Sequence, residues 1–240
     1  KEVAINKGKN LFESDVNPIF QCLSENYLNQ DAPKLNILFW DIETDFDPER
    51  GFAPVEDPFM PITAITVCMQ WLDSALITLA VPPKGLPFEE AKKMCYDRWG
   101  DSCILFPNDK DGNGEREMLQ VFLDLLEDAD IHSGWNSEGY DVPYTVNRIK
   151  RVLSNDDCRR FCLWGQMPKK REYEKFGKTS ETYDFVGRVH LDSLELYRKY
   201  TYEERHTYRL DAIGELEVGE NKTVYEGTLD QLYNNDFETF

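Results

Sequence analysis

The chain has 240 residues, a length that predicts one large domain or one domain with an appendage. Its 27 basic and 45 acidic residues give a formal net charge of −18, which excludes a protein that holds nucleic acid by counterion release alone. No apolar run approaches the roughly 18 residues of a membrane helix, no secretory signal is visible, and the six cysteines form no CxxC pair, so we expect a soluble, reduced, intracellular protein.

The first half of the chain predicts a short appendage followed by strands. Apolar residues at helical spacing over 16–23 predict a helix capped near Ser14. The apolar run 35–40 predicts a central strand buried on both faces. Residues 65–71 alternate as in a half-exposed strand, and after a turn residues 76–81 predict a third. These three strands are expected to form an antiparallel meander.

The second half alternates between helix and strand patterns. Helical spacing covers 115–128, a strand of 131–135 follows it, and a helix begins beside Asp141 with Pro143 at its first position. Further along, 189–191 read as a strand, 193–200 as a helix, and Leu210 opens the apolar face of another helix. The order predicts an α/β domain whose mixed sheet is flanked by helices, as in ribonuclease-H-like folds.

Two carboxylates come directly after the predicted central strand. Asp41 and Glu43 are two residues apart, so their side chains point to the same face. Unpaired charges at the end of an apolar strand need water or a cation, and Mg²⁺ prefers oxygen ligands. A solvated strand end that runs into an acidic loop is the alternative.

A third acid, Asp141, precedes a predicted helix at the mouth of a strand that could lie parallel to the central one. Asp is a common N-cap, because its side chain accepts hydrogen bonds from the first free amides of a helix. The residue could therefore be a cap or a member of a shared site with Asp41 and Glu43.

These motifs carry a family resemblance. Residues 39–44, Phe-Trp-Asp-Ile-Glu-Thr, resemble the first exonuclease motif of family B DNA polymerases. Asn136-x-x-x-Tyr140-Asp141 resembles the second, with Tyr in place of the commoner Phe. Residues 134–153 and 191–199 are similar to replicative polymerases of T-even-type tailed phages, and the resemblance extends from about Leu11 over most of the chain.

The resemblance implies a ribonuclease-H-like 3′→5′ proofreading exonuclease domain of a DNA-directed DNA polymerase, acting on mispaired primer ends during replication. Asp41, Glu43 and Asp141 would be catalytic and would hold two Mg²⁺ or Mn²⁺ ions. Asn136 and Tyr140 would lie near the terminal nucleotide, where an aromatic ring can stack on any base. The implied partners are the single-stranded primer 3′ end of DNA and the N-terminal, palm, fingers and thumb domains, with no membrane. The implied location is the host cytoplasm if the protein comes from a phage.

The third motif of the family, Tyr-x-x-x-Asp, is not found. Tyr208 and Asp211 have the wrong spacing, so Asp211 is interpreted as a surface residue, and the true motif is expected beyond Phe240. Residues 11–16 resemble the segment that joins the polymerase's N-terminal domain to its exonuclease domain. We therefore expect a truncated piece, with 1–33 a remnant or linker and 34–240 an exonuclease domain of weak or no activity.

Residues 165–183 contain a basic stretch, and the resemblance implies that they form a protruding β-hairpin. Lys169, Lys170 and Arg171 are followed by Tyr173 and Phe176, a pattern that suits contacts with DNA backbone and bases. The region is similar to a hairpin of phage relatives thought to separate primer from template. A solvated run of charges explains it equally well.

Other charged segments stay open or are assigned to structure. Arg148, Lys150 and Arg151 either add to a DNA-facing surface or form a solvated helix face. Residues 109–114 mimic a calcium loop but lack its final Glu, so a turn is favoured, and Asp192 is predicted to be an N-cap. A non-catalytic DNA- or protein-interaction domain with a nuclease-like fold is the alternative function, and a stand-alone nuclease is a weaker one.

Overall fold

The computed structural model describes residues 7, 15–108, 113–175 and 177–240. The chain divides into two compact units, Lys1–Lys34 and Leu35–Phe240. The first contains helix α2 (Pro18–Asn26), in which no residue is buried. Its N-cap is Asn17, whose side chain accepts a hydrogen bond from Ile19 N at 2.9 Å, so the predicted cap near Ser14 is wrong. Ser14 itself lies outside the described residues.

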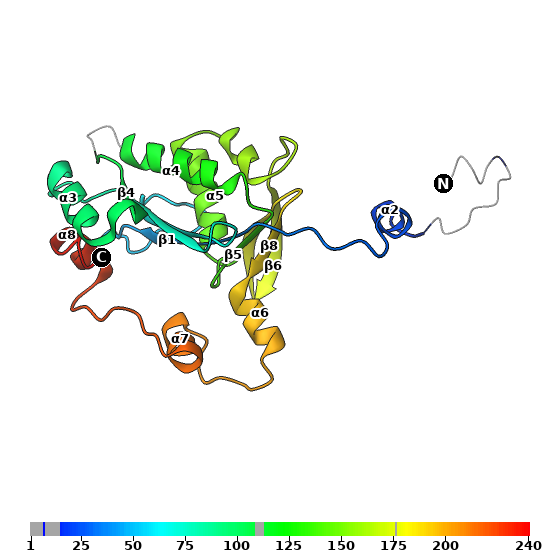
Figure 1. Cartoon of the computed structure of the whole chain (residues 1–240). Coiled ribbons are helices and arrows are strands. Elements are labelled where there is room, and N and C mark those ends of the chain that lie inside the picture. The colour runs from blue at the N-terminus through cyan, green and yellow to red at the C-terminus, as the bar shows by residue number, and fades with distance from the viewer. Residues whose placement is uncertain (1–6, 8–14, 109–112, 176) are drawn as a thin grey trace. The chain divides into compact units, whose positions relative to one another are not determined.

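A six-stranded sheet forms the centre of the second unit (Figure 1). Its order is β4-β3-β2-β1-β5-β8, and the strands are β1 (Ile37–Thr44), β2 (Ile62–Met69), β3 (Ala75–Ala80), β4 (Cys103–Leu105), β5 (Ile131–Gly134) and β8 (Val189–Asp192). Strands β1, β2 and β3 are antiparallel, which confirms the meander. Strand β5 is parallel to β1, and β8 is parallel to β5.

Helices flank this sheet, and two 3₁₀ turns each follow a helix and precede a strand. The helices are α3 (Phe88–Trp99), α4 (Asn113–Leu126), α5 (Asp141–Val152), α6 (Ser193–Tyr200), α7 (Leu210–Val218) and α8 (Leu229–Asn235), with 3₁₀ turns η1 (Gly100–Ser102) and η2 (Asp157–Phe161). A mixed sheet with a meander and parallel strands between helices confirms the predicted ribonuclease-H-like α/β fold. None of the described helices is long and apolar enough to cross a membrane.

The two faces of the sheet are packed differently, and we name them by their content. On the covered face, Trp40 and Ile42 join the large hydrophobic core formed with α4 and α5. On the opposite face, which we call the acid face because it carries Asp41 and Glu43, a smaller core joins Ala64 to residues of α3 and α8. In Figure 1, α4 and α7 lie on opposite sides of the sheet.

The burial of the first two strands is the reverse of the prediction. Strand β1 alternates, with Trp40 and Ile42 buried and Phe39 and Asp41 exposed, so it is not buried on both faces. Strand β2 is buried at most positions, because Ile65 meets the large core while Ala64 packs beneath α3 and α8. Sequence alternation did not reveal which strand has a helix on each side.

Three elements were not predicted. Helix α3 buries only Ala91 and Cys95, so its sequence shows little periodicity, and β4 is three residues long. Helix α8 has a capping box between Thr228 and Gln231.

A separate antiparallel pair, β6 (Lys169–Lys175) and β7 (Lys178–Asp184), occupies the region of the expected hairpin. Strand β7 packs against α5, and Thr182 and Tyr183 are buried there. Phe176 lies outside the described residues, as do residues 109–112 of the calcium-like loop.

Candidate active site

Asp41 and Glu43 lie inside β1 rather than after it. The antiparallel pairing with β2 continues to the end of the strand, and it sets Asp41 opposite Thr66 and Glu43 opposite Ala64. Because directly opposed residues share a face of a sheet, both acids project from the acid face. Their buried neighbours Trp40 and Ile42 point the other way and fix the strand in the large core.

Asp141 reaches the same strand from the helix layer. It is the first residue of α5 and is 4% exposed. Its Oδ1 accepts a hydrogen bond from Ile42 N at 3.2 Å, and its carboxyl group is hydrogen-bonded to that of Asp41. The N-cap position belongs to Tyr140. The structure therefore brings Asp41 and Asp141 into contact, and the capping interpretation of Asp141 is wrong.

Burial and mutual repulsion change the acidity of this cluster. Burial, the Asp41 charge and the hydrogen bond to Asp41 hold the pKa of Asp141 well above its usual range. Burial, followed by the Asp41 charge, raises the pKa of Glu43 to about 7, while Lys222 opposes that rise. A raised pKa at Asp141 is the expected result when two acids in contact resist carrying two adjacent charges.

These residues fit a hard divalent cation in their chemistry. The donor set consists of carboxylate oxygens, which Mg²⁺ and Mn²⁺ prefer, and a bound cation would relieve the repulsion between Asp41 and Asp141. Within the part of the chain that the structure describes, however, no three or more His, Cys, Asp or Glu side chains are grouped so that they could hold an ion. Glu43 projects from the same face without joining that contact.

The turn between β5 and α5 carries the other predicted residues. Asn136 is exposed and has a left-handed backbone, with φ at 58°. Tyr140 is half-buried, its ring lies 5.2 Å from that of Tyr144, and its hydroxyl is 3.0 Å from Thr44 Oγ1. A Cβ on Gly134 would lie 2.7 Å from Trp40 O, so only glycine allows this turn to approach β1 so closely.

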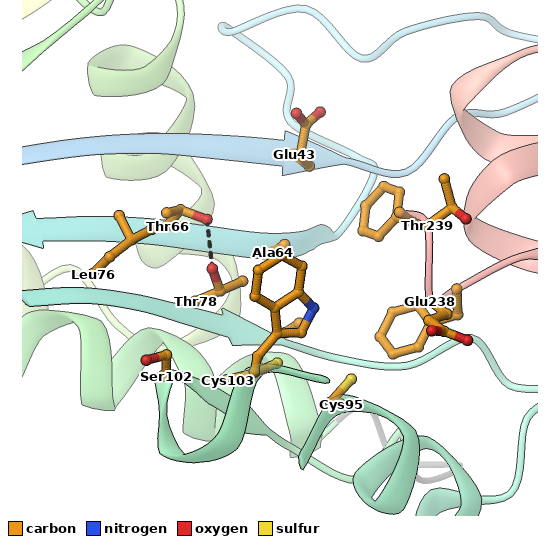
Figure 2. A pocket seen from close by; sticks show the side chains of 14 residues that line it. Glu43, Ala64, Thr66, Leu76, Thr78, Cys95, Ser102, Cys103, Glu238 and Thr239 are labelled. Atoms are coloured by element: carbon orange, nitrogen blue, oxygen red, sulfur yellow. Dashed lines mark hydrogen bonds between the residues drawn. The ribbon is translucent and has the colours of Figure 1, made fainter. Parts of the chain in front are cut away.

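Two cavities open over the acid face beside the carboxylates. The first, about 300 Å³, is lined by Glu43, and Figure 2 shows this side chain near the end of its strand with Cys95 and Cys103 on the opposite wall. The second, about 420 Å³, is lined by Asp41 and Lys222. Both are lined by Thr66 and Leu76, so the cavities adjoin. Asp41 and Glu43 are therefore each accessible to a small ligand.

Sequence reasoning missed two contributors to this site. Lys222, which follows α7, opposes the rise in the Glu43 pKa, and a single lysine in an acidic segment gave no signal of that role. Asp192 was predicted only as an N-cap. The structure confirms the cap, through Leu194 N at 2.9 Å, and adds bonds from Asn136 N at 3.1 Å and Glu138 N at 3.0 Å.

The predicted basic residues of the hairpin line neither of these two cavities. Lys169 is exposed, Lys170 pairs with Glu181 at 2.5 Å, and Arg171 pairs with Glu138 and Asp184. Tyr173 is half-buried, with the Arg171 guanidinium 5.8 Å from its ring centre.

The other basic residues considered for a DNA-facing surface have partners in the fold. Arg148 is buried in an ion pair with Glu115 at 2.6 Å, so both expectations for Arg148, a DNA surface and a solvated helix face, are wrong. Arg151 pairs with Asp57 at 2.7 Å, and Lys150 donates to Tyr183 at 2.8 Å. Asp211 is half-exposed in the first turn of α7.

Comparison with known proteins places these motifs in a family. A family model described as "DNA polymerase family B, exonuclease domain" matches residues 6–213. The chain is 31% identical over 142 residues to the DNA-directed DNA polymerase of Enterobacteria phage T4, and 28% identical over 142 residues to that of Escherichia phage RB69; each alignment covers 58% of this chain and 15% of the relative. It is 28% identical over 137 residues to the DNA polymerase delta catalytic subunit of Candida albicans, covering 52% of this chain and 13% of that protein.

The chain thus spans 15% or less of the length of these relatives. The family match covers most of its own length, from the N-terminal unit to α7. The chain belongs to the exonuclease-domain family of the family B DNA polymerases.

Proposed function

We propose that this chain is a 3′→5′ proofreading exonuclease domain that hydrolyses the terminal phosphodiester bond of a mispaired primer during DNA replication. The observation that carries the proposal is the contact between Asp41 and Asp141, two carboxyl groups that are one hundred positions apart in the chain and meet at one edge of the sheet. Two carboxyl groups in contact, one of which has a raised pKa, are suited to bind a divalent cation between them.

Asp41, Glu43 and Asp141 are the residues that would hold Mg²⁺ or Mn²⁺. Such ions, when bound, lower the pKa of water and stabilise the leaving oxygen of a phosphodiester. The chain itself contributes the placement of these carboxyl groups. Ile42 N holds Asp141 at 3.2 Å, and the buried side chains of β1 keep Asp41 from moving along the sheet.

The nucleic-acid partner that fits this site is a single-stranded 3′ end. Asn136 is exposed and Tyr140 half-buried on the turn that leads into Asp141, so they can meet a nucleotide whose phosphate lies at the acids. A ring can stack on an unpaired base without reading its identity, as proofreading requires. With a net charge of −18, the domain would bind DNA weakly and depend on the rest of a polymerase to hold the duplex. Such a polymerase would act in the cytoplasm of the host if it is a phage protein.

We expect the 240-residue chain by itself to be a weak nuclease. Among the described residues only Asp41 and Asp141 are in direct contact at the site, and Glu43 stands apart from them. Full activity would then require additional oxygen ligands supplied within the parent polymerase.

The test is degradation of a 5′-labelled single-stranded oligonucleotide by the parent polymerase, with the isolated chain in parallel, in Mg²⁺, in Mn²⁺ and in EDTA. Asp41→Asn and Asp141→Asn should each lower the rate at least about 100-fold, equivalent to about 2.7 kcal/mol of transition-state stabilisation. Asp211→Asn is the matched control, because Asp211 lines neither of the two cavities beside the acids.

Two outcomes would decide against the proposal. Activity that survives in Asp141→Asn would show that the contact is not catalytic. Binding of single-stranded DNA by the parent polymerase, with no cleavage in either metal, would favour the non-catalytic interaction domain instead.

A further inference from the structure

The turn that carries Asn136 and Tyr140 is held by two side chains of β8, the buried Asp192 and the half-buried His190. Asp192, 7% exposed, accepts the amides of Asn136 and Glu138 with its two carboxylate oxygens. The buried Ser137 hydroxyl lies 2.9 Å from His190 Nε2 and donates to Gly134 O at 3.1 Å. The backbone of the turn is thereby fixed to the sheet.

The side chain of Glu138 leaves this turn toward the hairpin. It pairs with the guanidinium of Arg171 on β6, and Arg171 Nε also donates to Asp184 Oδ1 of β7 at 3.0 Å. One guanidinium thus joins three segments, namely both strands of the hairpin and the turn that leads into Asp141. The planar, multidentate geometry of Arg suits such a bridge better than a single-point cation would.

The hairpin is attached to the site a second time through α5. Tyr183 of β7 is buried, its hydroxyl donates to Asn147 Oδ1 at 2.6 Å, and Lys150 Nζ donates to that hydroxyl at 2.8 Å. Because α5 begins at Asp141, both attachments lead to the same carboxylate. A displacement of the hairpin would therefore shift both the turn and the first residues of α5.

We propose that the Arg171–Glu138 ion pair is a positioning contact, which couples the β6–β7 hairpin to the nucleotide-facing turn of the site. This inference rests on the proposed function. Arg171 and Glu138 act through the turn and do not touch the reacting atoms. The pair lines a cavity of about 410 Å³ together with Asp184 and His190, so its side chains are free to separate when the hairpin is displaced.

The effect that the proposal predicts for Glu138→Gln is opposite to the effect that simple electrostatics predicts. Glu138→Gln removes a negative charge near the site, and on electrostatic grounds alone it should strengthen the binding of DNA. If the pair positions the turn, the same variant should instead lower kcat for 3′→5′ hydrolysis, by about tenfold, since small misplacement of a substrate-positioning group costs one to two orders of magnitude. KM should stay unchanged or fall.

The matched control is Glu181→Gln, which breaks the neighbouring pair with Lys170 but leaves every contact between the hairpin and the turn in place. It should leave kcat unchanged. A Glu138→Gln enzyme with normal kcat, or with faster turnover at a lower KM, would overturn the inference.

A second measurement does not depend on activity. Amide hydrogen exchange of residues 135–140 in this chain should become at least about tenfold faster in Glu138→Gln and stay unchanged in Glu181→Gln, with equal Tm in both. Unchanged exchange in Glu138→Gln would refute the coupling even if no nuclease activity is found. The two proposals can fail separately. If exchange becomes faster in Glu138→Gln but the wild-type polymerase shows no nuclease activity that depends on Asp41, the proposed function fails and the coupling stands.

Discussion

The acidic side chains on the covered face and on the acid face of the sheet have opposite kinds of partner. On the side of α4 and α5, the buried anion Glu115 has a cation in contact, because Arg148 lies 2.6 Å away. On the acid face, Asp41 has another acid in contact, Asp141. The first arrangement stabilises a fold, whereas the second raises the cost of ionisation and is relieved by a bound cation. The contrast separates a structural ion pair from a candidate catalytic pair of acids.

The contrast also explains why one strand serves both purposes. Alternate residues of β1 enter the large core, and those between them carry the acids. Because the core is packed as densely as a solid, it fixes the position of the backbone from which Asp41 and Glu43 project. A catalytic group held by a rigid element needs little reorganisation when the substrate binds.

The largest expected effect on stability comes from a substitution in the core of the covered face. Phe122 is fully buried, with its ring 5.1 Å from that of Trp40, so Phe122→Ala should lower the free energy of unfolding by about 3–5 kcal/mol. Leu76→Ala on the acid face, where Leu76 is 57% exposed, should cost under about 1 kcal/mol. Urea unfolding followed by circular dichroism measures both. Equal losses would show that the two faces are not packed differently.

A somewhat smaller effect tests the charged pair on the covered face. Arg148→Met leaves Glu115 buried without its cation and should cost about 3 kcal/mol of unfolding free energy. Adding Glu115→Gln removes the uncompensated charge while keeping an acceptor for Ile62 N, so the double variant should recover part of the loss. If it were less stable than Arg148→Met, the uncompensated charge would not be the cause.

The smallest effect compares how the faces respond to pH. Glu43 has a pKa of about 7 in the folded protein and an ordinary value of 4.5, so its contribution to stability is present below pH 4.5 and lost as the pH rises through 7. His132 on the covered face has its pKa lowered by burial to about 3, and its contribution is present above pH 6.5 and lost as the pH falls toward 3.

Urea unfolding in EDTA at pH 5, 6 and 7 separates the two groups. Glu43→Gln should remove a fall in stability of roughly 2 kcal/mol between pH 5 and pH 7. His132→Leu should remove only the opposite slope, below pH 6.5. A Glu43→Gln variant with the wild-type pH dependence would show that Glu43 is not buried beside a second charge.

Much of the fold follows from local pattern. The meander, the helix that begins at Asp141 and the parallel strand before it were predicted because periodicity of two or 3.6 residues depends only on the segment itself. The burial of β1 and β2 was predicted the wrong way round, because burial depends on which helices cover each strand. The same reason explains Arg148, whose solvated appearance in the sequence hid a buried partner 33 residues away.

The sequence by itself determined which residues could perform chemistry. Asp41 and Glu43 share a face because a strand alternates, and the sequence matches the family model over residues 6–213. Only the tertiary structure decided that Asp141 contacts Asp41, that the charge of Lys222 lowers the pKa of Glu43, and that Arg171 joins the hairpin to the turn. The physical reason is that local periodicity fixes where a side chain points, whereas strand pairing and helix packing fix which distant side chain it meets.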